Sequence, residues 1–269
     1  MKNIHIIGAG GIGGWIIDII NERFSLEQKR NTTIHLYDGD IVEANNLLRQ
    51  NFVITDIGMP KVEALELAYP FLNIIPYKKY IKEIPFIDIV NPNDDRRSED
   101  IVICAIDKAR ERVAFSIQCI TNHTIYIDVG NNVDDGQMVI EGVDDHPGLC
   151  SLYPDIIEKS YKEDFMSCAM ISQSSPQILQ VNFLGAELAV ETLPRLYNKE
   201  TVFNYEYNSL GDAMETLTHD FGKDGKYYRP RFDKLTKEQI DKIIEIYNSS
   251  VPVPKISSLD ILKDVGGEW

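Results

Sequence analysis

The feature that most constrains this chain is a glycine-rich stretch that directly follows its first apolar run. Residues 4–7 are mainly apolar, and glycines stand at positions 8, 10, 11, 13 and 14. A buried strand that turns sharply into a helix points backbone N–H groups and the positive end of the helix dipole at the space above the turn. The spacing Gly8-x-Gly10-x-x-Gly13 therefore predicts a loop that binds nucleotide phosphates, in either a dinucleotide-binding or an ATP-binding protein.

The composition limits the class of protein. The chain has 269 residues, of which 43% are hydrophobic, so it can bury one substantial core. Its formal net charge of −15 opposes binding to a phosphate backbone, and we expect no nucleic-acid partner. The apolar runs are far shorter than a membrane span, and the first residues lack a signal-peptide pattern. The sequence therefore predicts a cytoplasmic protein without membrane segments.

The four cysteines, at positions 104, 119, 150 and 168, are irregularly spaced and form no Cys-x-x-Cys pair. This pattern argues against a zinc site and against a disulfide framework. We expect reduced thiols, with Cys104 and Cys119 structural and Cys150 on an exposed loop.

Short apolar runs alternate with amphipathic stretches over the first 130 residues. This βαβ pattern predicts an α/β, Rossmann-like, doubly wound sheet that is mostly parallel. We expect strands at 3–7, 33–37, 74–79, 101–105 and 124–128, with helices near 12–24, 60–69 and 108–121.

After residue 130 the pattern changes to antiparallel strands. Alternation at 136–141 predicts the first of them. Residues 144–175 are polar and interrupted by prolines, which predicts a functional crossover loop. Pro176 is expected to open a long helix, followed by a strand at 201–207, a charged loop near 219–226 and a helix at 236–248.

Charged side chains follow the expected strands at the sheet edge where α/β folds bind ligands. Asp38 and Asp40 end the second strand, and a carboxylate there suits the ribose of a nucleotide. Arg49 and Lys61 follow, and cations that converge near a glycine loop suggest a triphosphate held at several points. Asp107 ends the fourth strand and suits Mg²⁺, which prefers carboxylate oxygens beside phosphates.

Taken in order, these residues resemble the ThiF/MoeB/E1 superfamily. The motifs that carry the resemblance, over about residues 3–195, are Gly8-x-Gly10-Gly11-x-Gly13, Asp38-x-Asp40, Asn46-x-x-Arg49-Gln50, Gly58-x-Pro60-Lys61 and Asp107-x-x-x-x-Arg112. The resemblance implies that Asp40 binds the ribose and that Asn46 and Arg49 contact phosphate or the attacking carboxylate. It further implies that Lys61 holds phosphates, that Asp107 coordinates magnesium and that Gln50 supports the nucleotide pocket.

Members of this superfamily use MgATP to adenylate the C-terminal glycine of a small ubiquitin-fold or sulfur-carrier protein, with release of pyrophosphate. The resemblance therefore implies an E1-like adenylyltransferase with ATP and Mg²⁺, a ubiquitin-fold partner, an E2-like or sulfur-transfer acceptor, and a homodimer. It also implies an adenylation domain at 1–199, with its crossover loop near 144–175, and a C-terminal extension at 200–269 packed on that domain.

Cys168 stands in the crossover loop, where related activators often place a cysteine that takes the activated carboxylate as a thioester or acyl disulfide. A thiolate near a helix N-terminus has a lowered pKa and attacks an acyl adenylate readily. The alternative is a small buried hydrophobic residue. The sequence leaves both interpretations open.

Three features depart from the superfamily pattern. Gly148 and Ser151 stand where many members have the first Cys-x-x-Cys pair of a structural zinc site, so we expect no zinc. The short segment before the first strand lacks the arginine-bearing helix of dimeric members, so we expect that arginine to come from elsewhere or to be unused. Lys108 replaces the usual asparagine after Asp107.

Two other functions stay open. An NAD-dependent oxidoreductase would account for the glycine loop and Asp38, but it would leave Arg49, Lys61 and Asp107 unexplained. A non-catalytic E1-like subunit of a heterodimer would account for the missing arginine, but the intact charged residues argue against it.

Overall fold

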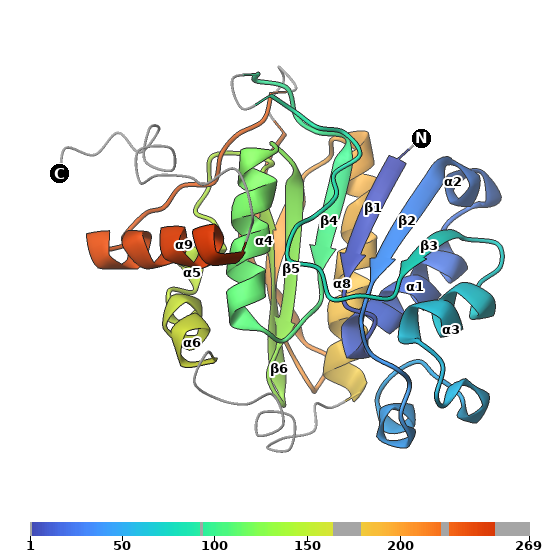
Figure 1. Ribbon diagram of the computed structural model, residues 1–269. Coiled ribbons are helices and arrows are strands. Elements are labelled where there is room, and N and C mark those ends of the chain that lie inside the picture. Colours follow the sequence, from blue (N-terminus) through green and yellow to red (C-terminus); the bar gives the residue numbers. More distant parts are fainter. Residues whose placement is uncertain (1, 92–93, 164–178, 222–225, 251–269) are drawn as a thin grey trace.

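One mixed sheet organises the molecule. The structure is a computed structural model that describes residues 2–91, 94–163, 179–221 and 226–250. Within these residues, eight strands form a sheet in the order β3-β2-β1-β4-β5-β6-β7-β8 (Figure 1). They are β1 (Lys2–Ile7), β2 (Thr32–Tyr37), β3 (Asn73–Tyr77), β4 (Asp100–Cys104), β5 (Ile125–Asn131), β6 (Asp135–Glu141), β7 (Val202–Asn208) and β8 (Ala213–His219).

The strands from β1 to β5 pair in parallel, and those from β5 to β8 pair antiparallel. The predicted Rossmann-like sheet, mostly parallel with antiparallel strands in the second half, is confirmed. Strand β1 lies between β2 and β4, so the chain order reverses at this point. Ligands of open α/β sheets bind at such a switch point, outside the carboxyl ends of the strands.

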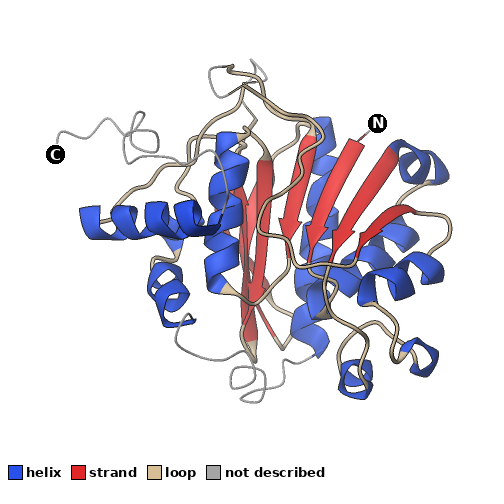
Figure 2. Ribbon diagram, viewed as in Figure 1, coloured by secondary structure: helices blue, strands red, loops and turns tan. Residues whose placement is uncertain are grey.

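Helices cover both faces of the sheet (Figure 2). The α-helices are α1 (Gly11–Arg23), α2 (Leu26–Asn31), α3 (Lys61–Ala68), α4 (Ala109–Thr121), α5 (Leu149–Leu152), α6 (Asp155–Glu163), α8 (Leu179–Asn198) and α9 (Lys237–Ser250), with short 3₁₀ helices η1 (Ala44–Leu48) and η2 (Ile54–Asp56). Helices α1, α3 and α8 share one hydrophobic cluster with the sheet, and α4, α5, α6 and α9 contribute to the other.

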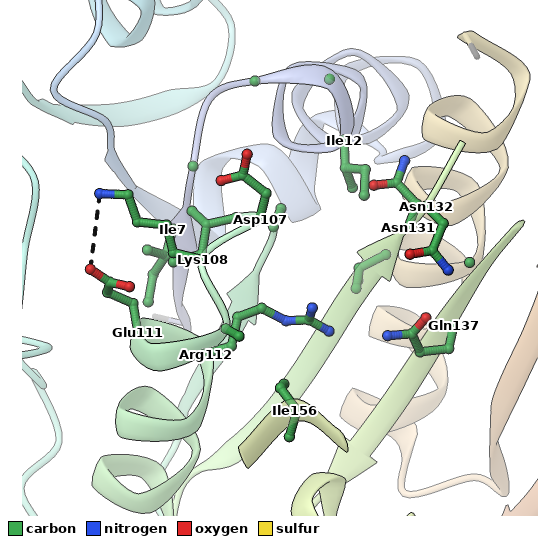
Figure 3. Close-up of a pocket in the computed structure, with 18 of the residues that line it drawn as sticks. Ile7, Ile12, Asp107, Lys108, Glu111, Arg112, Asn131, Asn132, Gln137 and Ile156 are labelled. Atoms are coloured by element: carbon green, nitrogen blue, oxygen red, sulfur yellow. Dashed lines mark ion pairs between the residues drawn. The ribbon is translucent and has the colours of Figure 1, made fainter. Parts of the chain in front are cut away.

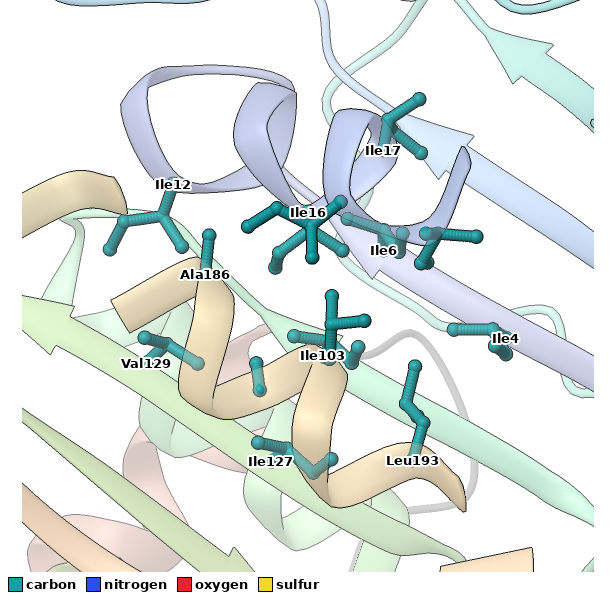
Figure 4. Close-up of a cluster of buried hydrophobic side chains, with 14 of the residues drawn as sticks. Ile4, Ile6, Ile12, Ile16, Ile17, Ile103, Ile127, Val129, Ala186 and Leu193 are labelled. Atoms are coloured by element: carbon teal, nitrogen blue, oxygen red, sulfur yellow. The ribbon is translucent and has the colours of Figure 1, made fainter. Parts of the chain in front are cut away.

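The first cluster shows how the sequence builds the fold. Isoleucines recur along α1 at helical spacing, and Ile12, Ile16 and Ile20 are buried. Figure 4 shows Ile12 and Ile16 above Ala186 of α8, and Leu193 of α8 belongs to the same cluster as Ile103 and Ile127 of the sheet. Each large apolar side chain buried in this way stabilises the fold by roughly 1.5–3 kcal/mol. This packing holds the glycine loop rigidly, because the loop joins β1 to α1.

The expected elements of the first 130 residues are present, but helix α2 was missed among them, and strand β8 was missed later in the chain. Helix α2 buries none of its residues, and its stability comes from a capping box between Ser25 and Gln28. Strand β8 is an edge strand whose first four residues are exposed, so it lacks an apolar face that a periodicity argument could detect. Strands β7 and β8 continue the same sheet beyond residue 199.

The predicted crossover loop at 144–175 contains more regular structure than expected. Helices α5 and α6 lie within it and pack against α4. The predicted nucleophile Cys168 and the predicted helix start at Pro176 lie outside the described residues. No helix of the described chain is both long enough and apolar enough to cross a membrane.

We expect Gly13→Ala to disrupt the glycine loop. A Cβ at Gly13 would overlap the carbonyl oxygen of Gly8, which belongs to the turn between β1 and α1. Overpacking of this kind costs roughly 1–3 kcal/mol or more, and urea unfolding should show a loss in that range. Gly14→Ala is the matched control, because the nearest atom to its Cβ would be 3.7 Å away. Equal losses for the two variants would contradict this account.

Candidate functional site

A cavity of about 1430 Å³ opens at the carboxyl edge of the parallel strands. One half of it is lined by the glycine loop and by the segments that follow β2 and β4. The other half is lined by β5, β6 and β7 and by the segment around α5 and α6. Figure 3 shows Asp107 beside the glycine loop and Arg112 reaching from α4 toward Gln137 of β6. The fold thus brings the predicted nucleotide residues to one cavity, except Gly13, which packs against the carbonyl oxygen of Gly8 and does not line it.

The glycine loop forms the wall of the cavity at the start of α1. Gly8 has φ +99°, and a Cβ there would lie 2.6 Å from the carbonyl oxygen of Ala105, so only glycine fits between β1 and β4. Gly10 precedes α1, and no side chain caps the first turn of this helix. Gly10 and Gly11 line the cavity. The positive end of the α1 dipole is therefore open to an anionic ligand.

Asp38 is a positioning residue for this loop. Its Oδ2 accepts a hydrogen bond of 2.8 Å from the backbone N–H of Ala9, and its Oδ1 accepts one of 2.8 Å from the N–H of Asp40. The side chain is buried and ties the turn after β1 to the turn after β2. A direct contact between Asp38 and a nucleotide stays a prediction.

Asp40 and Lys61 form an ion pair in the cavity. Lys61 Nζ lies 2.8 Å from Asp40 Oδ2, and the Tyr80 hydroxyl donates a second hydrogen bond to Oδ1. Burial by itself would raise the pKa of Asp40, but the hydrogen bonds from Lys61 and Tyr80 outweigh it and lower that pKa below its ordinary value. Asp40 is therefore a charged acceptor at neutral pH. Tyr80 was not among the predicted site residues. It is an exposed aromatic residue after β3, and only its place at the same sheet edge could have pointed to a role in the site.

Asn46 shapes the turn that presents Arg49 and Gln50. Its side-chain oxygen accepts a hydrogen bond from the N–H of Glu43, and its carbonyl oxygen accepts from the N–H groups of Arg49 and Gln50. Arg49 and Gln50 line the cavity. The Gln50 Oε1 is buried and has no hydrogen-bond partner among the described residues. An unpartnered acceptor of this kind is costly unless a ligand donates to it.

Asp107 is exposed on the cavity wall at the end of β4. Among the residues that the structure describes, no three His, Cys, Asp or Glu side chains come together as a metal cluster. An ion at Asp107 would take its other ligands from phosphate oxygens and water, which is how Mg²⁺ commonly binds with nucleotides. Asp107 therefore fits the predicted magnesium role. Its neighbour Lys108 lies 5.5 Å from the Tyr80 ring centre and 4.0 Å from Glu111.

Three cysteines lie in the described chain, and all of them are buried. The structural roles expected for Cys104 and Cys119 agree with this burial. The expected exposure of Cys150 is wrong, because α5 packs against α4 and β6 and leaves this side chain 2% exposed. Burial raises the pKa of the Cys150 thiol well above its ordinary value, which disfavours the thiolate.

A buried ion pair lies at the wall of the cavity, which Arg112 lines. Arg112 Nε donates to Asp128 Oδ1 at 3.0 Å, and Nη2 pairs with Oδ2. The Tyr126 hydroxyl lies 3.1 Å from the same carboxylate. A Cβ at Gly130 would collide with the Arg112 guanidinium, so this glycine makes room for it. The sequence offered Arg112 only as part of a motif, and it offered no signal for Asp128 as its partner.

Glu141 anchors the segment around Gly148 and Ser151, the two positions where many superfamily members have a zinc-binding Cys-x-x-Cys pair. Its carboxylate accepts hydrogen bonds from Leu149 N at 2.6 Å and from Ser116 Oγ at 2.7 Å. Ser151 Oγ donates to the carbonyl oxygen of Arg231. Burial raises the pKa of Glu141 to about 7, although both hydrogen bonds act in the opposite direction.

We expect Asp38→Asn and Asp40→Asn to separate loop positioning from nucleotide binding. In Asp38→Asn, one of the two backbone N–H groups faces the side-chain NH2 instead of an oxygen and loses its acceptor. Urea unfolding should therefore show a loss of stability of roughly 1–3 kcal/mol. The second keeps an acceptor for Lys61, so it should change stability by less than about 1 kcal/mol and weaken MgATP binding about tenfold in calorimetric titration. A larger stability loss for Asp40→Asn than for Asp38→Asn would reverse these roles.

We expect Glu141→Gln to change the pH dependence of stability. Between the ordinary carboxyl range and pH 7, the folded chain holds a proton on Glu141 that the unfolded chain releases. Wild-type stability should therefore fall as pH rises through this window, by about 1.4 kcal/mol for each unit of pKa difference. Urea unfolding of Glu141→Gln should lack this fall, whereas the exposed control Glu215→Gln should retain it. Parallel pH profiles for wild type and Glu141→Gln would contradict the assignment.

Comparison with known proteins gives a family and a fold. The family profile described as ThiF family matches residues 2–223. No curated protein matches the chain. E. coli MccB with AMPCPP and selenomethionine MccA is 18% identical, with a TM-score of 0.56 over 82% of this chain and 65% of that one. E. coli MccB with ATP is 17% identical, with a TM-score of 0.54 over 82% and 65%. PaaA is 17% identical, with a TM-score of 0.54 over 80% and 72%.

At these identities the structural likeness shows the fold, and the chain spans about 65% of the length of the MccB chains. The family profile covers most of the chain, including every described residue assigned to the cavity between Ile7 and Met214. The resemblance found from the sequence motifs is confirmed: this protein belongs to the ThiF family.

Proposed function

We propose that this chain is an E1-like adenylyltransferase that uses MgATP to activate the C-terminal carboxylate of a small protein or peptide. The observation that carries the proposal is the convergence of the glycine loop, the Asp40–Lys61 pair and Asp107 on one cavity. A dinucleotide site needs the loop and one acid, but it has no use for Lys61 and Asp107 at this edge. The proposal also agrees with the crystal structures of E. coli MccB with ATP and with AMPCPP and MccA.

In this proposal, contacts with ATP replace contacts between side chains of the protein, such as the Asp40–Lys61 ion pair. The ribose hydroxyls would donate to Asp40, and the phosphates would accept from Lys61, Arg49 and the N–H groups at the start of α1. Lys61 is almost fully buried, and its partner Asp40 is half-exposed, so Asp40 compensates the lysine until the phosphates replace it. Nucleotide binding would therefore exchange one ion pair for several charge-assisted hydrogen bonds.

The reaction itself needs orientation and charge more than a base. A carboxylate oxygen of the substrate attacks the α-phosphorus and forms the acyl–phosphate bond. The bond from that phosphorus to the oxygen bridging the β-phosphate breaks, and pyrophosphate leaves with the electron pair. The carboxylate is already ionised at neutral pH, so no proton has to be removed. Mg²⁺, held by Asp107 and phosphate oxygens, would neutralise charge on the leaving group.

The finer predictions extend the same proposal. The substrate would be a small ubiquitin-fold or sulfur-carrier protein with a C-terminal glycine, and an E2-like or sulfur-transfer acceptor would receive it. Transfer through Cys168, a homodimer and a cytoplasmic location stay predictions. A non-catalytic E1-like subunit of a heterodimer is the second candidate.

We expect Lys61→Ala to weaken MgATP binding by roughly tenfold or more, because it removes a charge-assisted hydrogen bond worth about 1.5–3 kcal/mol. Calorimetric titration with AMPCPP and Mg²⁺ measures this directly, and Lys237→Ala, an exposed lysine on α9, is the matched control. Asp107→Asn should bind the nucleotide equally well with and without Mg²⁺. Wild-type binding to NAD tighter than to MgATP would contradict the proposal.

A catalytic test follows the binding test. Wild type should catalyse exchange between ATP and pyrophosphate when ubiquitin-fold proteins that end in Gly-Gly are supplied. Lys61→Ala and Asp107→Asn should reduce that exchange at least a hundredfold, while Lys237→Ala leaves it unchanged. Tight MgATP binding without exchange for any supplied protein or peptide would favour the non-catalytic subunit.

A further inference from the structure

Half of the cavity is left over when the nucleotide contacts are assigned. This second half begins at Arg112 and is bounded by residues of β5, β6 and β7. Leu152, Tyr153 and Ile156, from the segment around α5 and α6, line its other side. It is continuous with the nucleotide half, so a substrate tail that reaches the α-phosphate has to occupy it.

Two hydrogen-bond donors converge where the halves meet. Arg112 is only 9% exposed and uses Nε and Nη2 for Asp128. A Cβ at Gly130 would lie within 2.8 Å of both Arg112 Nη2 and Gln137 Nε2, so the two groups approach the same point. Neither Arg112 Nη1 nor the Gln137 amide hydrogen-bonds to any residue that the structure describes. Figure 3 shows both side chains directed into the cavity.

Beyond this pair of donors the wall becomes acidic. Gln137 lies opposite Glu206 in the antiparallel register, and Asp135 lies opposite Asn208, which bonds Asp212. The exposed carboxylates that line this half are those of Asp135, Asp155, Glu206 and Asp212, against the single ammonium of Lys159.

Neutral groups are the partners of three of these carboxylates. Asp135 accepts from the Asn132 amide, Asp212 from the Asn208 amide and Glu206 from the Tyr153 hydroxyl. None of the four forms an ion pair within the described chain. Uncompensated charges that share one cavity raise the local concentration of the opposite charge.

We propose that this half of the cavity selects a substrate tail with a lysine or arginine shortly before its C-terminal carboxylate. The proposal rests on the proposed adenylation of such a tail. Arg112 and Gln137 donate to carbonyl oxygens of the last residues, and this guides the carboxylate toward the nucleotide half. The cationic side chain lies against the carboxylates of Glu206 and Asp212. The two oriented donors supply the geometry, and the acidic wall supplies the selection.

A peptide library tests this selection. The probe is a mixture of random hexapeptides with free C-terminal carboxylates, passed over the immobilised full chain. Peptides retained by wild type should be at least threefold richer in Lys and Arg than those retained by the Glu206→Gln, Asp212→Asn double variant. The matched control is Glu215→Gln with Asp241→Asn, which removes the same charge from residues that do not line the cavity. The enrichment should decline as salt rises from 50 to 500 mM, because the attraction is screened.

A second variant reports on the pair of donors. The Gln137→Ala variant should retain less peptide in total and keep the preference for Lys and Arg. In a separate comparison, wild type should retain less of a library with amidated C-termini than of the library with free carboxylates. Equal frequencies of Lys and Arg for wild type and the double variant would overturn the proposal. Retention of acidic or apolar peptides, or of no peptide above background, would also overturn it.

A parallel readout separates this inference from the proposed function. The same library is incubated with the chain, MgATP and hydroxylamine, and peptide hydroxamates are identified by mass spectrometry. Retention of Lys- and Arg-containing peptides without hydroxamates would support the selection and contradict adenylation. Hydroxamates without a charge preference would support adenylation and overturn the selection.

Discussion

The site depends on one buried carboxylate that ties two loops together. Asp38 accepts the backbone N–H of Ala9 with one oxygen and that of Asp40 with the other. These bonds hold the glycine loop after β1 against the turn after β2, at the point where the strand order reverses. Because Asp40 follows two residues later, the same anchor sets the position of the acid that pairs with Lys61. The position of the glycine loop and the position of the Asp40–Lys61 ion pair therefore both depend on Asp38.

The buried and the exposed charges of the cavity differ in whether they have partners within the chain. The buried charges have partners within the chain: Lys61 pairs with Asp40, and Arg112 pairs with Asp128. This is what the cost of burying an isolated charge requires. The exposed acids of Asp107, Glu206 and Asp212 have no ion-pair partner in the described chain, so they remain available to a ligand. Asp107 lies beside the glycine loop (Figure 3), and Glu206 and Asp212 line the half of the cavity where we place the substrate tail.

Much of the fold and part of the site could be predicted, and the failures have physical reasons. The buried parallel strands and α1 carry strong apolar periodicity, so they were found. Strand β8 and helix α2 bury almost nothing, so they had no pattern to detect. Tyr80, Asp128 and Gln137 were missed because each acquires its role from a neighbour distant in sequence. Cys150 was misplaced because the polar crossover segment folds into α5 and turns this side chain inward.

By itself the sequence determined the kind of fold and the kind of chemistry. Glycines at set spacing force a tight strand-to-helix turn, and acids and cations that follow strand ends must meet at one edge of a parallel sheet. Only the tertiary structure decided which of two neighbouring acids anchors the loop and which one pairs with Lys61 in the cavity. It also decided that Arg112 is neutralised by Asp128 and that an acidic wall continues the cavity. Those outcomes depend on burial and on cross-strand register, which one-dimensional patterns do not contain.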